Sequence, residues 1–194
     1  MQSISRVRAA VLAAGLGAAM IAPAMAGDIF LQIPNVIGDS TNASFKGDIP
    51  LTAYSQGFTD PASFTGGASG RGSSRSRTTC GAISIAKLID STSPDFLQWV
   101  TKGTLIPKAT VYFVSTPNGT GVSTARYTIK LTNVRVTSIT QSDAAGNTAG
   151  IGITESISMI AEKFQFTYST QTIDAVAAGG TETFGWDCLT DSAF

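Results

Sequence analysis

Two long segments of the chain alternate apolar and polar residues, and each changes phase once, which constrains the fold more than any other feature. In residues 126–139 the apolar side chains stand at odd positions before Asn133 and at even positions after it. In residues 155–170 they change from odd to even around Glu162-Lys163. Alternation with period two is typical of half-buried strands, and a change of phase is typical of a bulge or a bend.

Pairing these two segments as an antiparallel hairpin brings the two phase changes together when the numbers of paired residues sum to about 295. The turn then falls at Asn147-Thr148, inside a Gly/Ala/Asn segment that favours a turn by its composition. Matched phase changes on paired strands indicate that both strands bend around the corner of a barrel. The sequence therefore predicts a closed barrel of two β-sheets.

Residues 90–103 carry the signals of a single short helix. Ser93 is a suitable N-cap, and Pro94 suits the first helical position, where no backbone N–H is needed. Asp95 places a negative charge in the first turn, and Gly103 can end the helix in a left-handed conformation. A strand at 83–89 precedes these signals, so we expect strand, turn and helix in direct succession.

This strand, the Asp90-Ser91-Thr92-Ser93-Pro94 run and the short helix resemble the Hcp family, the ring-forming tube proteins of bacterial type VI secretion. Further segments resemble the family in the same order, namely the strand 28–33 with the turn Gly38-Asp39-Ser40, the strand ending at 54–58, and Phe184-Gly185-Trp186-Asp187. Asp187 stands where the family commonly has Asn. The residues that carry the family motif are Asp90, Ser93, Pro94, Gly185 and Trp186.

The resemblance implies a mainly β fold, a two-sheet antiparallel β-barrel with one short flanking α-helix. It implies a non-catalytic structural protein whose copies form a homohexamer, with rings that stack into a tube and a lumen that holds secreted effector proteins. It also implies that residues 57–77 form a protruding arm that reaches a neighbouring subunit or the next ring. Arg71, Arg75 and Arg77 of this arm are then expected to meet carboxylates across the contact.

Residues 1–26 have the pattern of a secretory signal peptide, a departure from the family, whose members normally lack one. Arg6 and Arg8 precede an apolar run, and Ala24-Met25-Ala26 is a small-residue cleavage site. Cleavage would leave residues 27–194 as a single domain, secreted or periplasmic. It would also remove two of 13 basic residues and none of 13 acidic ones, so the charge gives no reason to expect nucleic acid as a partner. No later apolar run is long enough to span a membrane.

The chain has two cysteines, Cys80 and Cys188. In an oxidising compartment an even number of cysteines predicts a disulfide, here one bond that ties the end of the chain to its middle. Closing a loop of this length stabilises a protein by about 4–5 kcal/mol on the chain-entropy account. Two free buried thiols are the alternative.

The sequence offers no catalytic, metal or cofactor site. It contains no histidine, which excludes a Ser-His-Asp triad and every zinc site that needs histidine. The glycine-rich run 66–70 lacks the lysine and the strand-to-helix setting of a phosphate loop. Glu155 and Glu162 could supply the paired carboxylates of a glycosidase, but on a regular strand they would lie on opposite faces.

Two other classes of protein remain open. The first is a secreted monomeric β-barrel that binds a ligand or a surface glycan, with Trp99 or Trp186 as a platform. The second is a chaperone–usher pilin. We rank it below both the Hcp-like protein and the binding module, because pilins usually place their cysteines closer together and lack a mid-chain helix. Charged residues make up only 13% of the chain, which suits a self-associating subunit and equally an ordinary exported β protein.

Overall fold

The computed structural model describes residues 27–61, 77–115, 123–143, 152–171 and 178–194. The predicted signal peptide, the predicted turn at 147–148, and Arg71 and Arg75 lie outside these residues. The elements are, in chain order, β1 (Asp28–Gln32), β2 (Ile49–Leu51), β3 (Ala53–Ser55), β4 (Phe58–Thr59), β5 (Thr79–Cys80), β6 (Ile83–Leu88), α1 (Ser93–Lys102), β7 (Leu105–Ser115), β8 (Thr124–Ser142), β9 (Thr154–Gln171), β10 (Ala178–Asp187) and β11 (Ser192–Ala193). The fold is mainly β, as predicted.

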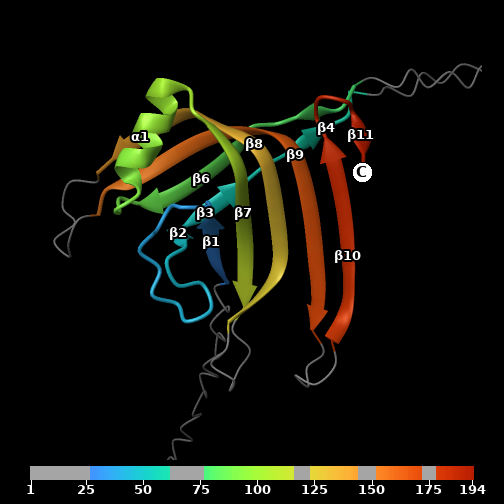
Figure 1. Cartoon of the computed structure of the whole chain (residues 1–194), viewed down its shortest axis with the longest axis horizontal. Helices are drawn as coiled ribbons and strands as arrows, with labels where there is room; N and C mark the ends of the chain where they lie inside the picture. Colours follow the sequence, from blue (N-terminus) through green and yellow to red (C-terminus); the bar gives the residue numbers. More distant parts are fainter. Residues whose placement is uncertain (1–26, 62–76, 116–122, 144–151, 172–177) are drawn as a thin grey trace, which may run out of the picture.

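A bent antiparallel sheet forms most of the molecule. Its strands follow the order β11-β10-β9-β8-β7-β1-β2, and β6 pairs with both β9 and β3. The long strands β7, β8, β9 and β10 run side by side, and α1 lies over one end of them (Figure 1). Strands β4 and β5 form a separate small sheet.

The β8–β9 hairpin has the register that the two phase changes predict. Tyr127 lies opposite Tyr168, and Val134 lies opposite Ala161. The register shifts between Val136 and Ser138, which is the irregularity expected of a strand that bends. The prediction of paired, bent strands is therefore confirmed.

Asn133 marks the phase change in β8. Its φ is 53°, in the left-handed region that asparagine tolerates better than most residues. Its side-chain Nδ2 donates to Glu162 Oε2 of β9 at 2.6 Å. The two residues at which the strands change phase thus lie opposite each other and are hydrogen-bonded.

The expected closure of the barrel is wrong, because the ladder stays open near Thr52. Among the described residues β2 pairs with β1 and β3 pairs with β6, and the chain changes partner between them. The Thr52 N–H donates to the Ala86 carbonyl at 2.8 Å, but the ladder does not continue from β2 to β6. At this change of partner Ala53 is exposed, whereas Ile49 and Leu51 before it are buried.

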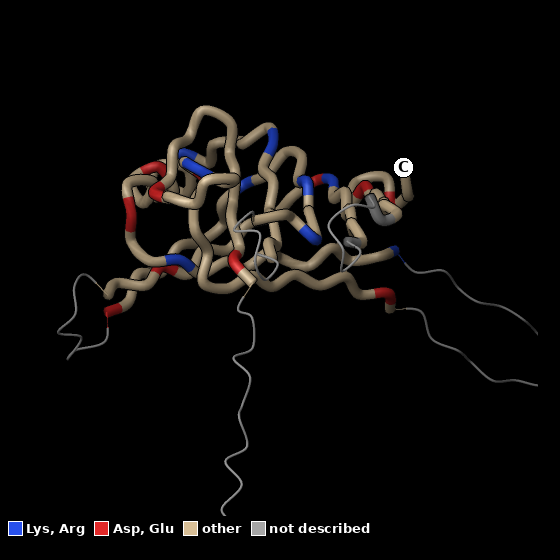
Figure 2. The backbone as a smooth tube through the Cα atoms, turned by 90° about the horizontal axis from the view of Figure 1, so that it is seen from below, with Lys and Arg blue, Asp and Glu red and all other residues tan. Residues whose placement is uncertain are grey.

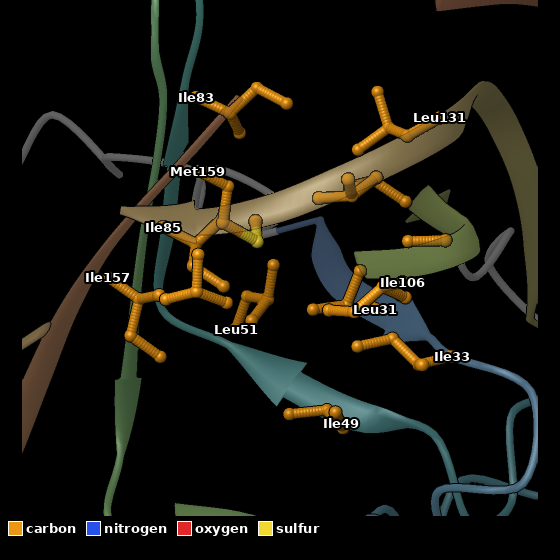
Figure 3. Packing of buried hydrophobic residues seen from close by; sticks show 14 of the residues in the cluster. Leu31, Ile33, Ile49, Leu51, Ile83, Ile85, Ile106, Leu131, Ile157 and Met159 are labelled. Carbon is orange, nitrogen blue, oxygen red and sulfur yellow. The ribbon is translucent and has the colours of Figure 1, made fainter. Parts of the chain in front are cut away.

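The core lies between the two halves of the bent sheet. Side chains from strands far apart in the sequence point toward one another there (Figure 3), and Phe96 of α1 joins the same cluster. The members that the figure labels are Leu31, Ile33, Ile49, Leu51, Ile83, Ile85, Ile106, Leu131, Ile157 and Met159. Nearly all of them come from alternate positions of paired strands, which is how period-two patterning fills one face of a sheet.

Replacing Asn133 tests whether its backbone conformation matters. Asn133→Val should lower the free energy of unfolding by about 1–3 kcal/mol, because a β-branched residue is strained at positive φ. Asn133→Gly is the matched control, since it loses the same hydrogen bond but tolerates this φ. Urea denaturation followed by circular dichroism measures both. Equal losses would show that only the hydrogen bond to Glu162 matters.

Candidate functional site

Helix α1 begins one residue before its predicted start, so the prediction of Ser93 as the N-cap is wrong. Thr92 is the N-cap, and its carbonyl accepts from the Asp95 N–H at 3.0 Å and from the Phe96 N–H at 3.3 Å. Its side chain makes no capping bond. Pro94 is the second helical residue, not the first as predicted, whereas Gly103 ends the helix at φ 62° as predicted. The Ser93 hydroxyl serves a different purpose, because it faces a buried ion pair.

The buried ion pair joins Lys87 of β6 to Glu155 of β9. The two residues are paired across the ladder, Lys87 Nζ lies 2.8 Å from Glu155 Oε2, and both side chains are 0% exposed. Lys87 Nζ also lies 2.6 Å from Asp90 Oδ1. The Ser93 hydroxyl accepts from Lys87 Nζ at 3.0 Å and donates to Glu155 Oε2 at 2.7 Å. Ser93 therefore connects the start of α1 to both strands.

The remaining polar atoms of this network also have partners. Gln141 of β8 donates to Glu155 Oε1 at 2.6 Å, and the Asp90 N–H donates to the Ser93 hydroxyl at 3.0 Å. Burial acts to raise the pKa of Glu155, but the hydrogen bonds from Lys87, Gln141 and Ser93 and the charge of Lys87 outweigh it and lower this pKa. A fully satisfied network of this kind holds elements together; here it fixes α1 to β6, β8 and β9.

Glu155 and Glu162, the candidate glycosidase pair, both have partners within the chain. Glu155 belongs to the network above, and Glu162 accepts from Asn133. A hydrolytic pair needs carboxyl groups that face each other across a substrate cleft. Each of these two carboxylates is instead bound by other side chains of the same chain, which gives it a structural role.

A second cluster of contacts lies where the middle of the chain meets its C-terminal segment. Cys80 of β5 and Cys188, directly after β10, form a disulfide with a Cα–Cα distance of 6.1 Å, the pairing expected from the sequence. The Arg77 Nη2 donates to the carbonyls of Cys188 at 2.8 Å and Leu189 at 2.6 Å. The Thr78 N–H donates to Asp191 Oδ1 at 3.0 Å. We call these contacts of residues 77–80 with residues 188–191 the C-terminal clamp.

The position of Arg77 bears on its expected role. Its guanidinium holds two backbone carbonyls of its own chain, so this part of the expected contact arm is fixed against the C-terminal segment. The role of the three arginines in contacts between subunits stays a prediction.

Gly185 and Asp187, in the closing motif, each have a specific structural requirement. A Cβ at Gly185 would lie 2.7 Å from the Phe194 ring, so only glycine lets this ring close against β10. Asp187 Oδ2 lies 2.8 Å from Lys163 Nζ, and Asp187 Oδ1 accepts from the Leu189 and Thr190 N–H groups. The hydrogen bond from Lys163 and those backbone bonds lower the pKa of Asp187 to about 2. An Asn there could accept the same N–H groups but could not pair with the lysine charge.

Aromatic side chains follow β9 and β10 on the face opposite that ring. Phe166 stacks on Phe164 at 6.1 Å and on Phe184 at 6.4 Å, and Phe184 stacks on Trp186 at 6.2 Å. We call these four residues the aromatic row. Phe164 is fully buried, whereas Phe184 is 52% exposed, so the row passes from the core to the surface.

The sequence carries a signal for the buried ion pair, which is not among the predicted sites. Lys87 follows Ile83 and Ile85 on the inward face of its strand, and Glu155 precedes Ile157 and Met159 on the inward face of another. Two opposite charges at inward positions of neighbouring strands predict a buried pair, because a lone buried charge is too costly.

Lys and Arg residues are spread along the described chain and do not gather in one stripe (Figure 2). Within the same residues no group of three or more His, Cys, Asp or Glu side chains could hold a metal ion. None of the described helices is long and apolar enough to cross a membrane.

Comparison with known proteins gives a consistent picture. A family model described as "Type VI secretion system effector, Hcp" matches residues 30–174. No curated protein matches the sequence. A solved type six secretion system protein has a TM-score of 0.77 at 20% identity and covers 87% of this chain and 100% of its own.

Two further solved structures share the fold. Hcp1 from Salmonella typhimurium has a TM-score of 0.69 at 20% identity, covering 88% of this chain and 100% of that one. A type VI secretion system effector from Yersinia pestis has a TM-score of 0.62 at 19% identity, covering 82% and 99%. At these identities the structural likeness shows the fold, and the family model shows membership.

A double-mutant cycle tests the buried ion pair. Lys87→Met should lower the free energy of unfolding by about 3–5 kcal/mol, because it leaves the buried Glu155 without a cation. Glu155→Leu should lower it by less, because Lys87 keeps Asp90 as a partner. The double variant should lose clearly less free energy of unfolding than the sum of the two single losses, since neither charge of the pair remains. Urea denaturation measures all four proteins. Additive losses would show that the two side chains do not depend on each other.

The same pair predicts an acid dependence of stability. A lowered pKa in the folded state gives stability that is complete above the ordinary pKa of a glutamate and is lost as the pH falls through the folded pKa. The double variant should therefore lose less stability than the unmodified protein between about pH 6 and pH 3. Urea denaturation at several pH values measures this difference, and parallel curves would contradict it.

Proposed function

Because the chain belongs to the Hcp family of type VI secretion proteins, we propose that it is a non-catalytic structural subunit that assembles with copies of itself. The copies close into a six-membered ring, and rings stack into a tube whose lumen can hold secreted effector proteins. The observation that carries this proposal is the family match over residues 30–174, on a structure with the bent antiparallel sheet and the single short helix.

Exposed apolar side chains support self-association. Leu105 of β7 and Ile160 of β9 lie on either side of Arg135 in one row across the sheet, and both are nearly half exposed. Leu189 and Phe194 are exposed near the end of the chain. Surface apolar groups that lie close together favour contact with another protein, and a closed ring is the form that a repeated head-to-tail contact gives when its rotation closes.

We further propose that the protein works outside the inner membrane, in the periplasm or beyond the cell. The signal-peptide pattern of residues 1–26 supports export, and the Cys80–Cys188 disulfide suits an oxidising compartment. Exported subunits would assemble after translocation, whereas the tube proteins that the sequence resembles are made without a cleavable signal. Assembly by a route separate from the type VI machine follows from this difference.

The aromatic row favours a second candidate, a monomeric binding module. Phe184, at the surface end of the row, is exposed and stacks on the half-buried Trp186. Exposed aromatic faces can bind a sugar or another flat ligand. A protein of this class would stay monomeric and would not need its exposed apolar edges for assembly.

The mass of residues 27–194 in solution separates the two candidates. After purification from the periplasm, we expect light scattering on a sizing column to give six times the subunit mass, and negative-stain images to show rings. A monomer at every concentration would overturn ring assembly and favour the binding module.

The arginines of the expected arm provide a matched pair of variants. Arg71→Ala/Arg75→Ala should reduce the fraction of protein in rings, because ion pairs across the contact would be lost. Lys108→Ala/Lys130→Ala removes the same charge from exposed positions of β7 and β8 and should leave that fraction unchanged. Equal behaviour of the two variants would contradict a specific role for the arm.

A further inference from the structure

The β4–β5 ribbon stands apart from the rest of the fold. Its two described residue pairs are Phe58 with Cys80 and Thr59 with Thr79, and it forms a sheet of its own. A two-stranded ribbon of this size is not stable by itself in water. Its position must therefore depend on contacts with other parts of the molecule.

Residues 77–80 reach the C-terminal segment through the C-terminal clamp. Its disulfide is covalent, and Arg77 and Thr78 add hydrogen bonds. Arg77 is exposed, and hydrogen bonds in contact with water contribute little each. The covalent disulfide is thus the strongest described attachment in the clamp.

On its other side the ribbon covers the aromatic row. The Phe58 ring meets Phe164 edge-on at 5.1 Å and Phe166 at 5.8 Å. Phe58 is 38% exposed, whereas Phe164 is 0% exposed. The Phe58 ring is therefore partly in contact with water, and it also covers the buried end of the aromatic row.

Most of the core lies away from this cover. The buried cluster is built from the long strands, β1, β2, β6 and α1; Phe58 is not part of it, although Phe164 beneath Phe58 is a member, and Cys80 and Cys188 pack against its edge. The ladders that join β6, β8 and β9 are separate from the ribbon. Detaching the ribbon would leave these pairings in place.

We propose that the Cys80–Cys188 disulfide is a redox-dependent attachment that holds the β4–β5 ribbon over the aromatic row. When the bond is formed, the ribbon stays in place and Phe164 and Phe166 are covered. When it is reduced, the ribbon leaves, the aromatic row meets water, and the barrel remains folded. The bond thus controls which of two surfaces this end of the sheet presents.

The chemistry is a thiol–disulfide exchange. The thiolate of one cysteine attacks an external disulfide, either a low-molecular-weight disulfide or a thiol–disulfide oxidoreductase, and releases one thiol. The second cysteine then attacks the mixed bond and releases the other thiol. Cys80 and Cys188 together lose two electrons and two protons, and the external disulfide gains both as two thiols.

One consequence rests on the proposed function. A subunit with a free ribbon and an uncovered aromatic row has lost the fixed geometry that a closed ring requires of every subunit. Assembly into rings would then follow oxidation, so it would be confined to an oxidising compartment.

Hydrogen exchange tests the attachment directly, on residues 27–194 in oxidised form and after treatment with dithiothreitol. The amides of Phe58, Thr59, Thr79 and Cys80 should exchange at least about tenfold faster after reduction. The amides of the β8–β9 ladder should keep their early protection. Binding of a hydrophobic fluorescent dye should increase as the aromatic row is uncovered.

Two controls keep the result specific. A Cys80→Ala/Cys188→Ala variant should behave as reduced protein and show no response to dithiothreitol. If this variant does not fold, the reduced unmodified protein still answers the question. Phe58→Ala in oxidised protein should raise dye binding while the ribbon amides stay protected, because only the cover has been removed.

Two outcomes would overturn the proposal. Unchanged protection of the ribbon amides after reduction would show that the clamp holds without the disulfide. Equal acceleration in the β8–β9 ladder would show that the bond stabilises the whole barrel. Light scattering on the same samples decides the consequence for assembly separately, since a monomer in both redox states would contradict the rings and leave the exchange result standing.

Discussion

The pairing of β9 with three other strands is the constraint on which the rest of the structure depends. One half of β9 pairs with β6 and β8, and the other half pairs with β8 and β10. A single strand can belong to both halves of the bent sheet only if the side chains that face the core change from one side of the strand to the other along its length. The bend at Asn133 and Glu162 provides this change, and it places the apolar residues of both halves toward one core. Without a matched change in β8, one half of the hairpin would turn its apolar face to water.

The ion pair of Lys87 and Glu155 lies at the end of the molecule where β6 joins β9. Burying a lysine and a glutamate costs several kcal/mol each before any partner is found, so the pair is poor evidence of stability taken alone. What it provides is position, because its partners come from β6, β8, β9 and the start of α1. A helix of ten residues would be marginal by itself, and Ser93 and Phe96 fix it at two adjacent points of the barrel.

Alternation along the strands was sufficient to predict the register of the main hairpin and the side on which the core lies. It failed where a tertiary contact decided the outcome. Ser93 has the right residue type for a cap, yet its hydroxyl is taken by Lys87 and Glu155. Barrel closure failed at Thr52, because a change of hydrogen-bonding partner leaves no mark in the apolar pattern. Arg77 binds backbone carbonyls, which every residue has, so the sequence could not name its partners.

The two ends of the sheet are fastened by different chemistry, and the difference has a physical consequence. The ion pair at the Lys87 end is held by charge and hydrogen bonds, which do not depend on the redox environment. The clamp at the other end needs oxidised sulfur. A chain of this design can form its long strand pairs and seat its helix first, because the β6–β9 and β8–β9 ladders and the ion pair do not include the cysteines. The ribbon is fixed last, when an external disulfide takes up the electrons. Whether β4 and β5 are held in place therefore depends on how oxidising the compartment around the chain is.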